Sequence, residues 1–292
     1  MNAVQAATAR RPATDPLAVR VLLTGAALLF VALFIVLPLA TVFAEALAKG
    51  AGAFWEAVKD PDTLFSVRLT LLVTISVVAA NMVFGLAAAW SITRFRFPGR
   101  RLLSSLIELP LSISPIVAGL VFILLLGDAG ICGRFLSAHG IKVIFALPGI
   151  ILATLFVTLP YVARELIPLM EAGGSQEEEA ALTLGARGWQ IFRRVTLPNI
   201  SWGLLYGVVL ASARALGEFG AVSVVSGHVR GETTTVPLQV EILYNEYHFA
   251  AAFAVASLLS LLALVTVGVK KWLQHHAAGA RPGHGCTRGT AT

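Results

Sequence analysis

The sequence contains several uncharged apolar runs, each long enough to cross a lipid bilayer as a helix. Residues 21–44 form one such run of 24 residues, and about 20 apolar residues span the hydrocarbon core of a membrane. Only 13% of the residues are charged and the mean hydropathy is +0.81, whereas soluble domains carry about 25% charged residues. The chain is therefore predicted to be an integral membrane protein.

Six segments are predicted to cross the membrane, which makes the expected fold class all-α and polytopic. The first run is too long for the apolar core of a signal peptide, so it is interpreted as a retained helix. The six spans are expected at residues 21–44, 69–93, 102–127, 143–163, 201–227 and 249–269. They form one permease-like domain, residues 21–271, between a polar N-terminal tail (1–20) and a C-terminal tail (272–292) whose composition predicts disorder.

The distribution of Lys and Arg predicts the orientation. With the N-terminus inside, fifteen of these residues fall on the cytoplasmic side and six on the outside, as the positive-inside rule requires. Both termini and the polar segment 171–200 are therefore expected in the cytoplasm. The same asymmetry explains the net charge of +6 without a nucleic-acid partner.

A polar segment, residues 175–198, interrupts the apolar pattern. Ser175 and Glu178 have the spacing of a capping box, which predicts the start of a helix. Gly185 is expected to end this helix in the left-handed conformation. A second short helix is predicted over residues 187–195, with Pro198 as its end. Two short helices joined at a glycine predict a docking element.

Two opposite charges lie within the fifth predicted span. Arg214 and Glu218 are four residues apart, so they share a helical face and are expected to pair. A charge at the bilayer centre costs at least about 2.5–3.5 kcal/mol, so both should face the interior of a bundle. The pair is either structural or part of a path or gate that favours anions. Gly217 and Gly220 would permit close backbone approach or a break in the helix.

Prolines recur in the third and fourth spans, at positions 110, 115, 148 and 160. They either kink packed helices or free backbone groups that line a water-filled path. Gly203 and Gly207 form a Gly-x-x-x-Gly motif, which indicates close helix contact.

The common catalytic motifs are absent from the sequence. There is no Gly-x-x-x-x-Gly-Lys-Ser/Thr phosphate loop for ATP, and no His-Glu-x-x-His or Gly-x-Ser-x-Gly motif for hydrolysis. The chain is therefore expected to be a non-enzymatic subunit that binds no cofactor or metal. A stand-alone secondary transporter, the more remote alternative, would need its own coupling-ion site and usually an internal repeat.

The polar segment resembles the EAA loop of bacterial ABC importer permeases. The residues that carry the resemblance are Glu179-Ala180-Ala181, Gly185 and Val195-Thr196-Leu197-Pro198, with Val195 where the family has Ile. The resemblance implies a type I importer permease whose loop couples to a separate ATP-binding subunit. The implied coupling residues are Glu179, Ala180, Ala181, Gly185, Leu197 and Pro198.

Residues in and after the fifth predicted span resemble one group of these permeases, those of oxyanion importers. Residues 213–221 are similar to the fifth helix of sulfate and molybdate permeases, and residues 226–247 look like the sulfate/thiosulfate permease subunits of the CysW type. The resemblance covers about residues 20–271. Arg214, Gly217, Glu218 and Gly220 are the implied candidates for the translocation path, and a molybdate or tungstate permease is the alternative.

This resemblance also implies the partners. They are a CysT-type permease that completes a heterodimer, two CysA-type ATP-binding subunits that hold ATP and Mg, and a periplasmic sulfate/thiosulfate-binding protein, in a bacterial inner membrane. Sulfate is strongly hydrated, so a path must replace its water with oriented polar groups. Ser112, Ser114, Ser223 and Ser226 lie near expected helix breaks and are candidates for this role.

Overall fold

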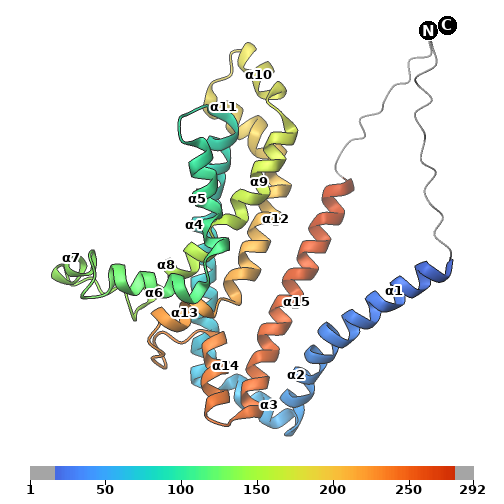
Figure 1. Ribbon diagram of the computed structural model, residues 1–292, viewed down its shortest axis with the longest axis vertical. Helices are drawn as coiled ribbons and strands as arrows, with labels where there is room; N and C mark the ends of the chain where they lie inside the picture. Colours follow the sequence, from blue (N-terminus) through green and yellow to red (C-terminus); the bar gives the residue numbers. More distant parts are fainter. Residues whose placement is uncertain (1–16, 280–292) are drawn as a thin grey trace.

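The computed structural model describes residues 17–279, and within that range the chain is helical with no strand. Figure 1 shows the arrangement. The elements are α1 (Leu17–Val31), η1 (Ala32–Val36), α2 (Leu37–Leu47), α3 (Gly50–Lys59), α4 (Pro61–Arg94), α5 (Arg100–Ser112), α6 (Pro115–Leu126), α7 (Gly133–Ala138), α8 (Leu147–Thr158), α9 (Pro160–Gly173), α10 (Gln176–Thr183), α11 (Gly188–Ile191), η2 (Phe192–Thr196), α12 (Leu197–Leu216), α13 (Gly220–Val225), α14 (Val236–Asn245) and α15 (Phe249–Gly279).

Five helical stretches of the described chain are long and apolar enough to cross a membrane. They are Leu17–Leu47, Pro61–Arg94, Leu147–Gly173, Gly188–Leu216 and Phe249–Val269, and a sixth results if the bent pair α5 and α6 counts as one span. The expected all-helical, multi-span class is therefore confirmed. Helix α15 continues to Gly279, so the first residues of the expected C-terminal tail are helical. Residues 1–16 and 280–292 of the two tails lie outside the described residues.

The third expected span consists of two helices, with the break close to Ser112 and Ser114, where one was expected. Helices α5 and α6 meet at an angle of 110°, with Ile113 and Ser114 in extended backbone conformations between them. Pro115 causes this break, because the ring of a proline disfavours the helical conformation in the residue before it. Pro110, by contrast, lies inside α5.

Two π-helical turns occur in the described chain, and each directly precedes a Leu-Pro pair. In η1 the N–H of Leu37 bonds to the carbonyl of Ala32, and in η2 the N–H of Leu197 bonds to that of Phe192. The proline that follows has no N–H to donate to a helical hydrogen bond, and its ring clashes with the carbonyl four residues earlier. A π turn widens the helix at that point and makes room for the ring. The helix therefore passes through the proline.

The core lies between α4, α8, α9 and α12, where small residues allow close approach. A Cβ atom on Gly85 would lie 2.7 Å from Cβ of Val162, and one on Gly207 would lie 3.2 Å from Cα of the same valine. A Cβ on Gly203 would meet the Leu169 side chain at 2.3 Å. The expected close contact of the Gly-x-x-x-Gly motif is thus confirmed, with α9 as its partner.

Buried polar contacts tie the long helix α4 to its neighbours. The Asn81 side chain donates to Thr158 Oγ1 of α8 at 2.7 Å, and Thr70 Oγ1 accepts the N–H of Val236, at the start of α14, at 2.9 Å. Asn81 is fully buried. Such bonds matter because a buried polar group without a partner is costly.

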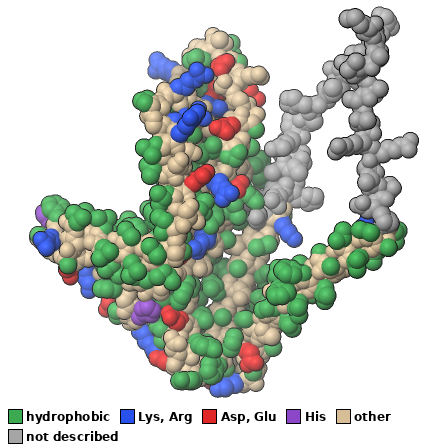
Figure 2. Space-filling model, in the orientation of Figure 1, with side chains coloured by type: hydrophobic (Ala, Val, Ile, Leu, Met, Phe, Trp, Pro, Cys, Tyr) green, Lys and Arg blue, Asp and Glu red, His purple; other side chains and the backbone are tan. Residues whose placement is uncertain are grey.

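Two parts of the chain extend away from this core. Helix α1 and turn η1 contain no buried residue, and Figure 1 shows α1 leaning away from the bundle. Helices α6 and α7 form an arm on the opposite side of the same view. Figure 2 shows hydrophobic side chains over both extensions, while charged side chains gather at the end that carries α10.

We expect Gly85→Ala to destabilise the protein by about 1–3 kcal/mol, because the added methyl overpacks the contact with Val162. Gly268→Ala is the matched control, since an added Cβ there meets nothing within 4 Å. The measurement is the thermal unfolding midpoint of the purified protein in detergent. Adding Val162→Ala should restore part of the loss, and an unchanged midpoint in Gly85→Ala would contradict the packing described here.

Candidate functional site

The segment between α9 and α12 stands out from one end of the bundle (Figure 1). Glu177, Glu178 and Glu179 occupy the first turn of α10, where the helix dipole favours negative charge. Gly185 follows this helix with φ +81°, so the expected left-handed residue is confirmed. Leu184, just before this glycine, is 88% exposed, and Trp189, after it, is 68% exposed. This end of the protein therefore presents large apolar side chains among charges.

The capping box expected for this segment is wrong. Ser175 makes no side-chain bond to the backbone of α10, and its hydroxyl donates to Glu179 Oε1 at 2.5 Å. Glu178 turns instead toward the end of α4, where its Oε2 lies 2.7 Å from Nε of Arg94. The ion pair with Arg94 therefore takes the carboxylate that was expected to cap the start of α10.

The second helix lies where it was predicted, but it does not end at Pro198. Helix α11 begins at Gly188 and runs without interruption through η2 into α12. Pro198 therefore lies inside a continuous helix, where the wider turn of η2 accommodates its ring. The fifth span consequently begins near residue 188 and ends at Leu216, earlier at both ends than expected.

The implied coupling residues divide into two groups by their position in the chain. Glu179, Ala180 and Gly185 are exposed and Ala181 is half-buried, all on α10 or directly after it. Leu197 is half-buried and Pro198 exposed at the start of α12. The first group is free to contact another molecule, while the second connects that surface to a span.

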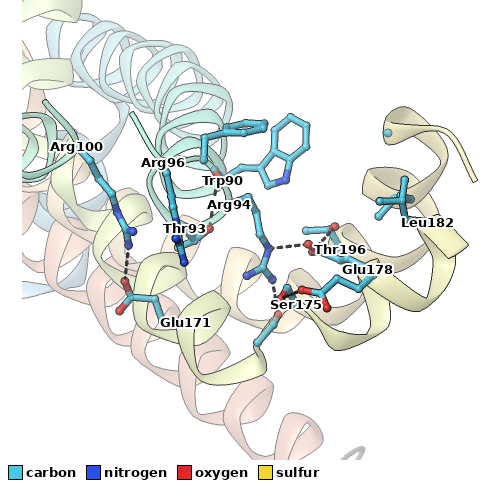
Figure 3. Close-up of a pocket in the computed structure, with 15 residues that line it drawn as sticks. Trp90, Thr93, Arg94, Arg96, Arg100, Glu171, Ser175, Glu178, Leu182 and Thr196 are labelled. Carbon is cyan, nitrogen blue, oxygen red and sulfur yellow. Dashed lines mark hydrogen bonds and ion pairs between the residues drawn. The ribbon is translucent and has the colours of Figure 1, made fainter. Parts of the chain in front are cut away.

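A cavity of about 580 Å³ lies at the base of this segment, between the end of α4 and α10 (Figure 3). Arg94, Arg96 and Arg100 line one side, and Glu171, Glu178 and Glu179 also line it. Sequence reasoning missed the role of Arg94 and counted it only as a cytoplasmic charge. The signal for an ion pair was present in the sequence, because a cation ends one predicted span and a later helix begins with three acids.

Arg214 and Glu218 form the pair that the sequence predicted. Nη1 of Arg214 lies 2.5 Å from Oε2 of Glu218, and the Glu218 side chain is 1% exposed against 30% for Arg214. The other carboxylate oxygen, Oε1, accepts the N–H of Ala221 at 2.8 Å. Glu218 thus accepts a backbone N–H in the first turn of α13 and forms an ion pair with Arg214 in the last turn of α12.

The fifth span breaks at Gly217. A break in the helix was one of the two outcomes expected for Gly217 and Gly220. Helix α12 ends at Leu216 and α13 begins at Gly220. A Cβ on Gly220 would lie 3.0 Å from Cβ of Pro115, so this glycine permits close contact between α13 and α6. The two broken spans therefore meet at their breaks.

A very small cavity, about 10 Å³, adjoins this pair. Its lining includes Thr70, Thr154, Glu218 and Thr235, and the hydroxyls of Thr154 and Thr235 have no hydrogen-bond partner within residues 17–279. This polar space lies inside a single subunit. None of the four candidate serines lines it. Ser112 and Ser114 are exposed at the bend after α5, and the Ser223 hydroxyl donates to the carbonyl of Gly220. Ser226 is buried, and its hydroxyl accepts the N–H of His228.

No group of three or more His, Cys, Asp or Glu side chains in the described part of the chain has an arrangement that could hold a metal ion. The two features with a distinct chemistry are therefore the exposed α10–α11 segment and the Arg214–Glu218 break.

Comparison with known proteins supports one family. Residues 81–278 match the family described as "Binding-protein-dependent transport system inner membrane component". Among curated proteins, the chain is 50% identical to the sulfate transport system permease protein CysW of Escherichia coli K12 over 252 residues, which cover 86% of this chain and 87% of that one. It is 39% identical to CysT of the same organism over 246 residues, 83% of this chain and 89% of the other.

Among solved structures, one similar chain belongs to a bacterial alginate ABC transporter in complex with an alginate-bound periplasmic protein. Its TM-score is 0.72 at 18% sequence identity, over 88% of this chain and 96% of that one. The likeness shows a shared fold and confirms the expected fold class. Membership of the matched family also agrees with the expected non-enzymatic role. The chain belongs to the family of inner-membrane components of binding-protein-dependent transport systems.

Proposed function

We propose that this protein is a permease subunit of an ATP-driven importer of sulfate and thiosulfate. The observation that carries the proposal is the 50% identity to CysW, which extends over 86% of the chain. In this role the chain contributes half of a path for a doubly charged anion, and the energy comes from ATP hydrolysis on a partner. ATP and Mg are bound by that partner.

The α10–α11 segment is the proposed coupling element. Its exposed face combines the acids of the first turn with large apolar side chains, Leu184 and Trp189 among them. Such a mixture suits docking to another protein, because buried aromatic and apolar anchors supply most of the binding energy at interfaces. The proposed partner is one of two CysA-type ATP-binding subunits.

A second permease of the CysT type is the proposed partner within the membrane. Helix α1 has no buried residue in the described chain, and the arm of α6 and α7 exposes Ile131 and Phe135. Side chains of this kind pack against lipid or another subunit. The similarity to CysT as well as CysW supports a heterodimer of related permeases, and a periplasmic sulfate/thiosulfate-binding protein would deliver the anion.

The proposed orientation places α10 in the cytoplasm of the bacterial cell. In Figure 1 the C-terminal end of α15 points toward the same end of the molecule as α10, whereas α3 and α14 lie at the other. The excess of Lys and Arg predicted for the α10 side supports a cytoplasmic location by the positive-inside rule. Both termini are then cytoplasmic.

The first test is uptake of radiolabelled sulfate into proteoliposomes that contain this chain, the CysT-type permease, the ATPase and the binding protein. We expect ATP-dependent uptake that unlabelled sulfate and thiosulfate suppress and molybdate does not. Suppression by molybdate alone would discard sulfate as the substrate. Uptake by this chain without the ATPase would favour a secondary transporter.

Substitutions in α10 test the docking role. Glu179→Lys reverses an exposed charge, and Gly185→Val forces a β-branched residue into a positive φ, which is a genuine outlier for such residues. Both are expected to lower co-purification of the ATPase about tenfold or more, while the protein stays in the membrane. Gly99→Val is the matched control, because Gly99 has φ +93° in open space outside this segment. Normal ATPase retention in Glu179→Lys and Gly185→Val would refute the docking role.

Arg214, Gly217, Glu218 and Gly220 are proposed to belong to the anion path or its gate. Arg214→Ala should reduce sulfate uptake without loss of the complex, because the path loses its cation and a buried carboxylate loses its partner. The double variant Arg214→Met, Glu218→Gln separates the two causes, since it removes both charges and keeps an oxygen that can accept from Ala221. Uptake that stays low in the double variant supports a path role, and recovery would make the pair purely structural.

A further inference from the structure

One carboxylate joins the proposed coupling helix to two membrane spans. Oε2 of Glu178 lies 2.7 Å from Nε of Arg94, at the end of α4. Oε1 of the same residue accepts a hydrogen bond of 2.7 Å from Oγ1 of Thr196, in the turn that leads into α12. Figure 3 shows these three side chains together at the base of α10. Thr196 is buried, and the Arg94 and Glu178 side chains are each only 16% exposed.

Arg94 extends this joint to a third helix. Its Nη1 donates to the carbonyl of Met170 at 3.3 Å and its Nη2 to that of Gly174 at 2.8 Å. Both carbonyls lie at the C-terminal end of α9. The carbonyl groups of a last helical turn have no intrahelical N–H partner, and a cation is favoured beside them. The planar guanidinium holds these partners in fixed directions, which a lysine could not do.

The Glu178 joint differs from the other polar contacts at this end of the protein. Arg100 and Glu171 also line the cavity and lie 3.2 Å apart, but their side chains are 38% and 54% exposed. Asn199 donates to Glu177 at an exposed site. Exposed ion pairs contribute little because water screens them. The Glu178 joint is shielded and links three helices, so it is the firm connection between α10 and the bundle.

The two spans that share Glu178 both reach the middle of the molecule. Helix α4 accepts the N–H of Val236 at Thr70, and α12 ends at the Arg214–Glu218 break. A displacement of α10 that preserves the joint must therefore move the ends of α4 and α12 together. Were the joint absent, α10 would lose its ion pair with α4 and could shift without moving that helix.

We propose that Arg94, Glu178 and Thr196 are positioning residues that make α4 and α12 follow the coupling helix when the ATP-binding subunit changes conformation. The inference rests on the docking role proposed above for α10. It assigns a task to three residues that are not among the candidate coupling or path residues. Their loss should separate ATP hydrolysis from transport and leave docking intact.

The test uses the complete reconstituted transporter and measures sulfate taken up per ATP hydrolysed. Thr196→Val keeps the shape of the side chain and removes the hydroxyl that Glu178 accepts from. We expect the ratio to fall about tenfold, within the usual range for coupling between sites, while the ATPase still co-purifies and hydrolyses ATP. Arg94→Lys should act in the same direction. Thr196→Ser, which retains the hydroxyl, should keep the ratio of the unaltered protein.

Arg100→Ala is the matched control, because it breaks an ion pair in the same cavity that is exposed and joins only α5 to α9. Its ratio of uptake to hydrolysis is expected to equal that of the unaltered protein. The thermal unfolding midpoint of each variant is measured in parallel. A joint that served stability alone would lower the midpoint in Thr196→Val and leave the ratio unchanged.

The outcomes distinguish this inference from the proposed function beneath it. If Thr196→Val and Arg94→Lys transport with the normal ratio, the joint has no coupling role, whereas docking of α10 stands. If the unaltered chain neither retains the ATPase nor shows ATP-dependent sulfate uptake, the proposed function itself fails. If Arg94→Lys does not assemble, Thr196→Val and Thr196→Ser decide the question, because they differ from each other mainly in the hydroxyl.

Discussion

Backbone hydrogen bonding without water is the constraint on which the rest of this structure depends. In hydrocarbon every N–H and carbonyl must find a partner within the protein, so a span can break only where a side chain or an altered turn replaces the lost bonds. Glu218 does so for the start of α13. At the end of the bundle that carries α10, Arg94 bonds in the same way to carbonyls at the end of α9. Glu218, which is only 2% exposed, thus allows one helix to stop and the next to begin.

Helix α12 connects the two features to which we assign functions. Its approach through η2 carries Thr196, which is bonded to the proposed coupling helix, and its last turn carries Arg214, which faces the break. Both ends are held by carboxylates from neighbouring segments, Glu178 and Glu218. One rigid helix with a polar contact at each end is well suited to relate events at the membrane surface to events within it.

Local chemistry was largely readable from the sequence, and contacts between distant segments were not. The spans, the left-handed Gly185 and the Arg214–Glu218 pair follow from hydropathy, a single glycine and a four-residue spacing. The capping box failed because Glu178 binds Arg94, from a different helix. The prolines of the third span predicted either a kink or freed backbone groups, but not the size of the bend. The angle of 110° depends on packing against α13, a segment about 100 residues later in the chain.

The π turn before Pro198 has a consequence for the register between the coupling segment and the span. Each residue of a helix turns the chain by about 100°, and η2 holds one residue more than an α-helical turn would between bonded groups. The face that α11 shows is therefore offset in azimuth from the faces of α12. A change of length by one residue in Phe192–Thr196 would rotate the proposed docking surface about the helix axis even if every other contact in the bundle were preserved.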